Sequence, residues 1–82
     1  MNDVRGYFIS TRKRIEQADQ SHIGVKLGLL CIQLDVPVME VANRFGVTRQ
    51  TVYSWFLGKR LPTPKATQKI AEYIAELEAR SL

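Results

Sequence analysis

Residues 38–55 read VMEVANRFGVTRQTVYSW, and in this stretch two short amphipathic patterns meet at a single glycine, Gly46. Intervals of three and four residues place the apolar residues of the first pattern on one helical face: Val38, Val41, Ala42 and Phe45. The second pattern has its own apolar face, made of Val52, Trp55 and Phe56. The first helix must end in a left-handed residue, a conformation that glycine adopts without a steric penalty from a Cβ atom. The stretch therefore predicts a helix-turn-helix.

Two neighbouring residues support this turn. Thr48 precedes the second helix and is a favourable N-cap, because its hydroxyl can accept a hydrogen bond from a free N–H of the first turn. Ala42 is small at the point where the second helix has to come close to the first. A helix-turn-helix of this kind mainly serves to place its second helix in the major groove of DNA.

The size and composition limit the remaining possibilities. A chain of 82 residues makes one small domain with a modest core. Its hydrophobic fraction of 45% and charged fraction of 24% are typical of folded rather than disordered chains. The net charge of +4 suits a polyanionic partner without requiring one.

Catalytic and metal chemistry find little support. Cys31 is the only cysteine and falls on an apolar helical face, so we expect a buried thiol. His22 is the only histidine, and with Cys31 it falls short of the three or four ligands of a zinc site. Because no catalytic constellation and no glycine-rich phosphate loop appear, we expect no enzyme, cofactor, metal or small-molecule ligand.

The sequence also bears on location. No apolar run approaches the ~20 residues that span a bilayer. The N-terminus lacks the basic-then-apolar order of a signal peptide. These features predict a cytoplasmic protein without a membrane partner.

The N-terminal segment, residues 1–20, reads differently from the rest. Its periodicity is consistent with a short helix, a strand or an arm. It contains the basic run Arg12, Lys13 and Arg14. A solvated surface and an arm that touches phosphates or the minor groove both fit this run.

Residues 21–82 read as one DNA-binding domain with the motif at about 38–57. A helix is expected after Ser21, a plausible cap. Its Gly24 and Gly28 each lower helix propensity by about 1 kcal/mol relative to alanine, and their four-residue spacing predicts close approach of another segment.

A last helix is predicted over about 64–79, because Thr63 and Pro64 form a start signal. Its stripe of Ile70, Ile74 and Leu77 is expected to close the core. Tyr73, Leu77 and Leu82 are alternatively an apolar edge for a second subunit. The fold class is therefore all-α, a compact bundle of four to five helices around a central helix-turn-helix.

The second helix of the motif, residues 49–57, has a polar outward arc. Successive residues turn by about 100°, so the residues that face away from its apolar side are Arg49, Gln50, Tyr53, Ser54 and Leu57. Arginine can donate two hydrogen bonds to guanine O6 and N7, and glutamine can pair with adenine N6 and N7. Solvated side chains are the ordinary alternative, and the preceding turn is what favours base contact. Tyr53 suits a thymine methyl, a phosphate or a shield over the core.

Cations beside this helix are candidates for the DNA backbone. Lys59 and Arg60 follow the helix, and a helix in the groove brings its C-terminal loop to the phosphates. Arg44 and Lys65 are further candidates for backbone contact.

At these residues the chain resembles the phage repressor and Cro family of helix-turn-helix regulators, the lambda-repressor-like domains. The resemblance runs from about Ile23 to Ile74. It rests on Ala42, Gly46, Val47, Val52 and Trp55, followed by Gly58, Lys59 and a proline-containing loop.

The resemblance implies a lambda-repressor-like fold and places base-reading positions at Arg49, Gln50 and Ser54. It implies backbone contacts from Thr48 and Lys59. It also implies a homodimeric repressor of transcription that binds a pseudo-palindromic operator in double-stranded DNA.

The chain departs from the family pattern in ways that concern the interface. Pro37 and Val38 stand where the family usually has a polar cap and a glutamine that touches phosphate. The family often closes with a fifth short helix after a glycine, whereas residues 65–79 show no break and read as one long helix. Residues 1–20 lie outside the minimal domain. Other classes also fit: a helical interaction module, such as an antitoxin or adaptor, and a DNA-binding component of phage packaging or recombination.

Overall fold

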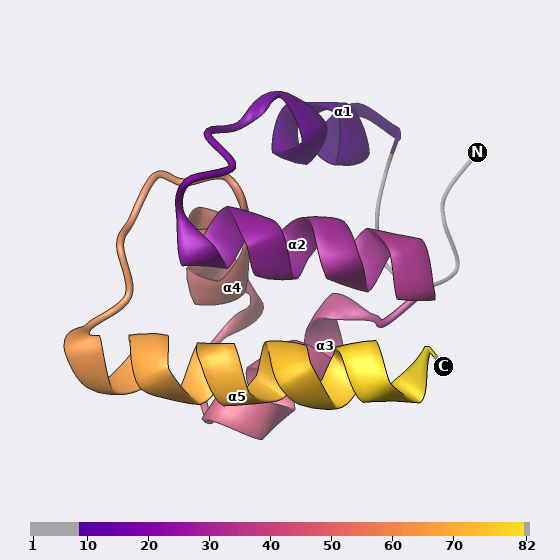
Figure 1. Cartoon of the computed structure of the whole chain (residues 1–82). Coiled ribbons are helices and arrows are strands. Elements are labelled where there is room, and N and C mark those ends of the chain that lie inside the picture. Colours follow the sequence, from indigo (N-terminus) through magenta and orange to yellow (C-terminus); the bar gives the residue numbers. More distant parts are fainter. Residues whose placement is uncertain (1–8, 82) are drawn as a thin grey trace.

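The computed structural model describes residues 9–81, and in this part of the chain all regular secondary structure is helical, with turns and loops between the helices. Its helices are α1 (Ile9–Gln17), α2 (Ile23–Leu34), α3 (Val38–Phe45), α4 (Arg49–Phe56) and α5 (Pro64–Arg80). α2 is the central helix and packs against α1, α4 and α5. In Figure 1, α1 lies above α2 and α5 lies below it, with α2 and α5 running in the same direction. The predicted all-α class is confirmed.

The turn between α3 and α4 has the predicted conformation. Gly46 ends α3 with φ +66°, and its backbone N–H donates to the carbonyl of Ala42. A Cβ atom on Gly46 would meet nothing within 4 Å. Glycine is therefore favoured here by its backbone conformation and not by lack of space.

The two glycines of α2 bring α4 almost into backbone contact. A Cβ atom on Gly24 would lie 2.5 Å from the carbonyl oxygen of Trp55. One on Gly28 would lie 2.8 Å from Cγ of Phe56 and 3.2 Å from a methyl of Ile15. The predicted close approach is confirmed, and the approaching segment is α4, with α1 beside it.

The core is formed by every helix of the described part. Its fully buried side chains are Ile15, Val25, Leu27, Cys31, Val41, Val52, Phe56, Ile70, Tyr73 and Leu77. Burial raises the pKa of the Cys31 thiol to about 12, so the thiol stays protonated at neutral pH. The buried cysteine is confirmed.

The proposed apolar edge on α5 is wrong for two of its residues. Tyr73 is 1% exposed and Leu77 is 0% exposed, because both side chains face the core. The third residue, Leu82, lies outside the described residues.

The start of α2 also differs from expectation. The N-cap residue is His22, which makes no side-chain capping bond. Ser21 instead donates from its N–H and its hydroxyl to the carboxylate of Asp19, at 2.9 and 2.7 Å. Ser21 is therefore hydrogen-bonded to the carboxylate of Asp19 and, contrary to the expectation from the sequence, does not cap α2.

Polar contacts fasten α3 to α5. Both terminal nitrogens of the Arg44 guanidinium donate to the carboxylate of Glu76, and the central guanidinium carbon lies 4.8 Å from the ring centroid of Tyr73. The Tyr73 hydroxyl and Arg80 each donate to one oxygen of Glu40, both at 3.1 Å. The first helix of the motif is therefore held to α5 by charge as well as by packing.

Aromatic rings join the same helices. The ring of Phe45 packs edge to face against the rings of Trp55 and Tyr73. The centroid-to-centroid distances are 5.7 Å to Trp55 and 5.6 Å to Tyr73. Edge-to-face geometry at these distances is favourable. One ring on α3 thus contacts both α4 and α5.

No helix of the described part has the length and apolar character needed to cross a bilayer.

The substitution Gly24→Ala tests the contact between α2 and α4. Helix propensity alone would make alanine more stable by about 1 kcal/mol. The clash with the Trp55 carbonyl should instead lower the free energy of unfolding by about 1–3 kcal/mol. Urea unfolding measures the change, and Lys26→Ala, at an exposed position of the same helix, is the control. A stabilised Gly24→Ala protein would contradict the contact.

The Arg44–Glu76 pair predicts a pH dependence. Hydrogen bonds from Arg44 hold the pKa of the Glu76 carboxyl below its ordinary value of 4.5. A carboxyl with a lowered folded-state pKa stabilises the fold above the unfolded-state value, and that contribution disappears as pH falls through the folded-state value. The difference in unfolding free energy between wild type and Glu76→Gln should therefore be constant near neutral pH and shrink below about pH 4.5.

Glu78→Gln, at an exposed neighbouring position on α5, is the control for this comparison. A difference that stayed constant into strong acid would show that the pair does not contribute through its charge.

Candidate nucleic-acid interface

α4 separates an inward and an outward face as the sequence predicts. Val52, Trp55 and Phe56 are buried against the other helices. Arg49 and Gln50, at the N-terminal end, are exposed. The helix therefore presents its polar first turn to solvent, where a base-reading helix needs it.

The start of α4 is fixed by its cap. The Thr48 hydroxyl oxygen accepts a hydrogen bond from the N–H of Thr51 at 3.2 Å, and the two threonine hydroxyls are 3.2 Å apart. The predicted N-cap is confirmed. Its consequence is a defined position for the side chains of the first turn.

The chain beyond α4 folds back onto the same helix. Gly58, with φ +71°, donates from its N–H to the carbonyl of Trp55. The N–H groups of Lys59 and Arg60 both donate to the carbonyl of Ser54, at 2.9 and 3.2 Å. These bonds form a Schellman-type ending, which satisfies carbonyls that the helix leaves free. They also bring two cations beside the outward face of α4.

The result is a solvent-open depression of about 400 Å³, here called the polar hollow. Its lining residues are Thr48, Gln50, Thr51, Ser54, Lys59 and Arg60. The structure thus brings together five residues that were predicted separately as base or backbone contacts. Thr51 was missed, although its three-residue spacing from Thr48 was a signal that it would share the first turn.

Ser54 has a specific hydrogen-bonding role. Its hydroxyl donates to the carbonyl of Gln50 at 3.0 Å, so its proton is already used within the helix. The hydroxyl oxygen keeps lone pairs that can accept from the amino group of a base. In this rotamer Ser54 is therefore better suited to a base amino group than to a phosphate oxygen.

Arg49 and Tyr53 do not line the polar hollow. Arg49 occupies the first position of α4. The ring of Tyr53 meets that of Phe56 edge to face at 6.5 Å. Burial raises the pKa of the Tyr53 hydroxyl, while nearby Arg49 acts in the opposite direction. Tyr53 thus partly covers the core, one of the alternatives that the sequence left open.

Arg44 and the basic run lie elsewhere. Arg44 is engaged by Glu76, a residue 32 positions away, so its guanidinium faces α5. Arg12, Lys13 and Arg14 belong to α1, whose buried Ile15 packs beside Gly28 of α2. Lys13 and Arg14 are exposed on that helix, and Arg12 is half-buried.

The distribution of charge favours an anionic partner on the α4 side. Residues 41–71 hold six of the twelve lysines and arginines and no aspartate or glutamate. The acidic residues Glu72, Glu76 and Glu78 lie in the C-terminal half of α5. A stretch around α4 in which every charged side chain is positive attracts polyanions and steers their approach.

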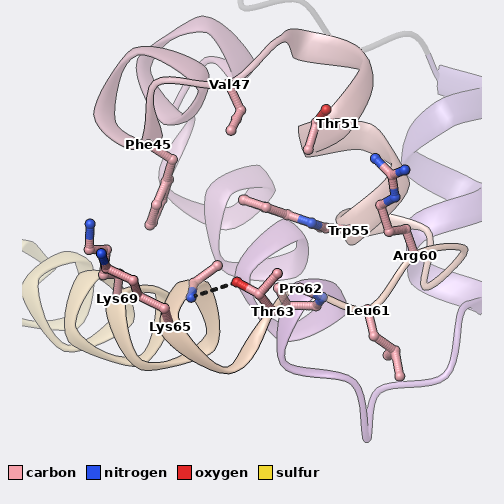
Figure 2. A pocket seen from close by; sticks show the side chains of 11 residues that line it. Phe45, Val47, Thr51, Trp55, Arg60, Leu61, Pro62, Thr63, Lys65 and Lys69 are labelled. Carbon is pink, nitrogen blue, oxygen red and sulfur yellow. Dashed lines mark hydrogen bonds between the residues drawn. The ribbon is translucent and has the colours of Figure 1, made fainter.

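A groove of about 570 Å³ lies between the motif and the start of α5, here called the apolar groove (Figure 2). Its lining residues are Phe45, Val47, Thr51, Trp55, Arg60, Leu61, Pro62, Thr63, Lys65, Ala66 and Lys69. The dashed line in Figure 2 marks the cap of α5, where the Thr63 hydroxyl accepts from the N–H of Ala66 at 3.2 Å. Among the described residues, no cluster of His, Cys, Asp and Glu could hold a metal ion.

These features define a helix-turn-helix DNA-binding domain: a left-handed glycine turn, a capped second helix and cations around its exposed end. A helix-turn-helix family model matches residues 31–77, more than half of the chain. The chain belongs to this helix-turn-helix family, as its resemblance to the phage repressor and Cro type implied. Searches of curated proteins and of solved structures found no match.

The two threonine caps allow a matched test of the interface. Thr48→Ala and Thr63→Ala each remove one capping bond of 3.2 Å, and each should lower the free energy of unfolding by about 0.5–2 kcal/mol. Of the two variants, only Thr48→Ala should also weaken DNA binding, because Thr48 lines the polar hollow and Thr63 does not. Thermal unfolding and fluorescence anisotropy with labelled duplex DNA measure the two effects. Equal losses of DNA affinity would contradict this assignment.

Proposed function

We propose that this protein is a sequence-specific regulator of transcription that binds double-stranded DNA with α4 in the major groove. The polar hollow is the observation that supports this proposal most strongly. It gathers the exposed first turn of α4 and two cations of the following loop in one place. The stretch around it carries no carboxylate that would repel phosphate.

The proposed base-reading residues are Arg49, Gln50 and Ser54. Arg49 donates to guanine and Gln50 pairs with adenine, while Ser54 accepts from a base amino group. Tyr53, which partly covers the core, contacts a thymine methyl or a phosphate with its exposed edge. Each good bidentate pair contributes about 1–3 kcal/mol of discrimination between bases.

The proposed backbone contacts are Thr48, Lys59 and Arg60. Thr48 sits at the N-terminus of α4, where backbone N–H groups favour an anion. Lys59 and Arg60 are exposed and held beside the helix by the Ser54 carbonyl. Arg44 contributes only if its ion pair with Glu76 opens.

Residues 1–20 are proposed as a basic addition to the DNA-binding domain of residues 21–82. Lys13 and Arg14 are exposed on α1 and would add phosphate contacts outside the polar hollow. Such contacts would increase affinity without adding sequence preference.

The protein is proposed to act in the cytoplasm as a homodimeric repressor. One recognition helix reads few base pairs, and two copies related by a two-fold axis read two half-sites of a pseudo-palindromic operator. Occupation of the operator would then block transcription.

Arg49→Ala and Lys59→Ala should affect DNA binding differently. Loss of Arg49 should cost about 1–3 kcal/mol at the preferred sequence and relax the preference at one base pair. Loss of Lys59 should weaken binding to all sequences about equally and reduce the slope of log K against log salt by about 1. Anisotropy titrations with matched and unmatched duplexes at several salt concentrations measure both effects.

Lys26→Ala, on the exposed side of α2, is the charge-matched control. If Arg49→Ala left both affinity and sequence preference unchanged, the proposed reading face of α4 would be wrong.

The dimer predicts concentration-dependent association. Sedimentation velocity over a concentration series measures this association with and without operator DNA. In the presence of DNA, it should show two chains per duplex. A monomer that persisted at high concentration in the presence of DNA would end this part of the proposal.

A further inference from the structure

We propose that the apolar groove binds an acidic amphipathic peptide segment of a partner protein, and that this segment competes with DNA for Arg60. The peptide-binding half of the proposal stands on the groove alone. The competition rests on the proposed DNA-binding function.

The groove offers a preformed apolar surface. The edge-to-face contact of Phe45 with Trp55, at 5.7 Å, fixes two of its aromatic rings, and Val47 lies beside them. Leu61 lines the groove with 65% of its surface exposed. A volume of about 570 Å³ falls within the range of ligand-binding clefts, roughly 300–1,000 Å³. The groove therefore has room for apolar side chains of a peptide.

The charged residues that line the groove are all cations. In the view of Figure 2, Lys65 and Lys69 lie at one end and Arg60 lies at the other, with Trp55 between them. All three cations are exposed, and no described carboxylate pairs with them. This arrangement is complementary to a segment that carries carboxylates beside its apolar side chains.

A second copy of this chain fits the groove less well. A two-fold contact through the groove would bring two sets of Arg60, Lys65 and Lys69 together. Like charges at an interface oppose association. The charge of the rim therefore favours an acidic partner over self-association at this surface.

The groove and the polar hollow share residues. Thr51 and Arg60 line both. A carboxylate that holds the Arg60 guanidinium in the groove withdraws it from a phosphate at the hollow. The two ligands should therefore weaken each other, and by thermodynamic linkage the two effects are equal in size.

The test uses the full chain and a fluorescein-labelled synthetic peptide built from alternating glutamate, leucine and phenylalanine. Its controls are a peptide with lysine in place of glutamate and one with serine in place of the apolar residues. Anisotropy in the absence of DNA measures binding to the groove. Only the acidic amphipathic peptide should bind.

Variants locate the bound peptide. Leu61→Ser should weaken peptide binding about tenfold, because one apolar side chain is lost from the contact. Lys69→Gln should weaken it severalfold. Met39→Ser and Lys26→Gln change an exposed apolar residue and an exposed lysine outside the groove, and both should leave binding unchanged.

Competition is measured with labelled duplex DNA. The acidic peptide should raise the apparent Kd for DNA, and DNA should raise the Kd for the peptide by the same factor. Leu61→Ser should bind DNA as wild type does but lose sensitivity to the peptide.

Peptide binding that failed, or that ignored both groove substitutions, would overturn the groove assignment even if DNA bound normally. Self-association that was lost in Leu61→Ser would assign the groove to a second copy and also overturn the proposal. Peptide binding without any effect on DNA affinity would overturn the competition. If the chain did not bind DNA, the peptide titrations would still decide the groove assignment.

Discussion

The near-contact of α2 with α4 is the constraint on which the rest of the structure depends. Without a Cβ at Gly24, the carbonyl of Trp55 lies against the α2 backbone, and Gly28 admits the ring of Phe56. This contact fixes the position of α4 relative to α2 and so determines which residues of α4 remain exposed to solvent. Phe45 then links α3, α4 and α5 through its two edge-to-face contacts. The exposed turn of α4 is thus supported by packing against α2 and α3, and a reading helix needs such support.

Local features of the fold were predictable because their causes are local. The left-handed Gly46, the caps Thr48 and Thr63 and the small residues of α2 each depend on a few neighbouring positions. The ion pair of Arg44 with Glu76 was not predictable, because it joins residues 32 positions apart. The burial of Tyr73 was missed for a similar reason. The place of Tyr73 in the core depends on two residues of α3. Its ring packs against Phe45, and its hydroxyl donates a hydrogen bond to Glu40.

The candidate site was partly predictable in the same sense. Helical periodicity identified the outward residues of α4, and the following cations could be read from the chain. What the sequence could not supply is the geometry of the loop. The carbonyl of Ser54 binds the N–H groups of both Lys59 and Arg60, and this joins the loop to the helix around one hollow. Helical periodicity also did not reveal that the Ser54 hydroxyl is already donating to Gln50.

The central claim is that the outward face of α4 reads base pairs in duplex DNA. Selection of bound sequences from a random pool of duplexes tests it most directly, because every possible short target is present in the pool. We predict enrichment of a short motif with two-fold symmetry, and a change of that motif at one position in each half-site when Arg49 is replaced by alanine. Binding without enrichment of any motif, or an identical motif from the Arg49→Ala protein, would contradict the account.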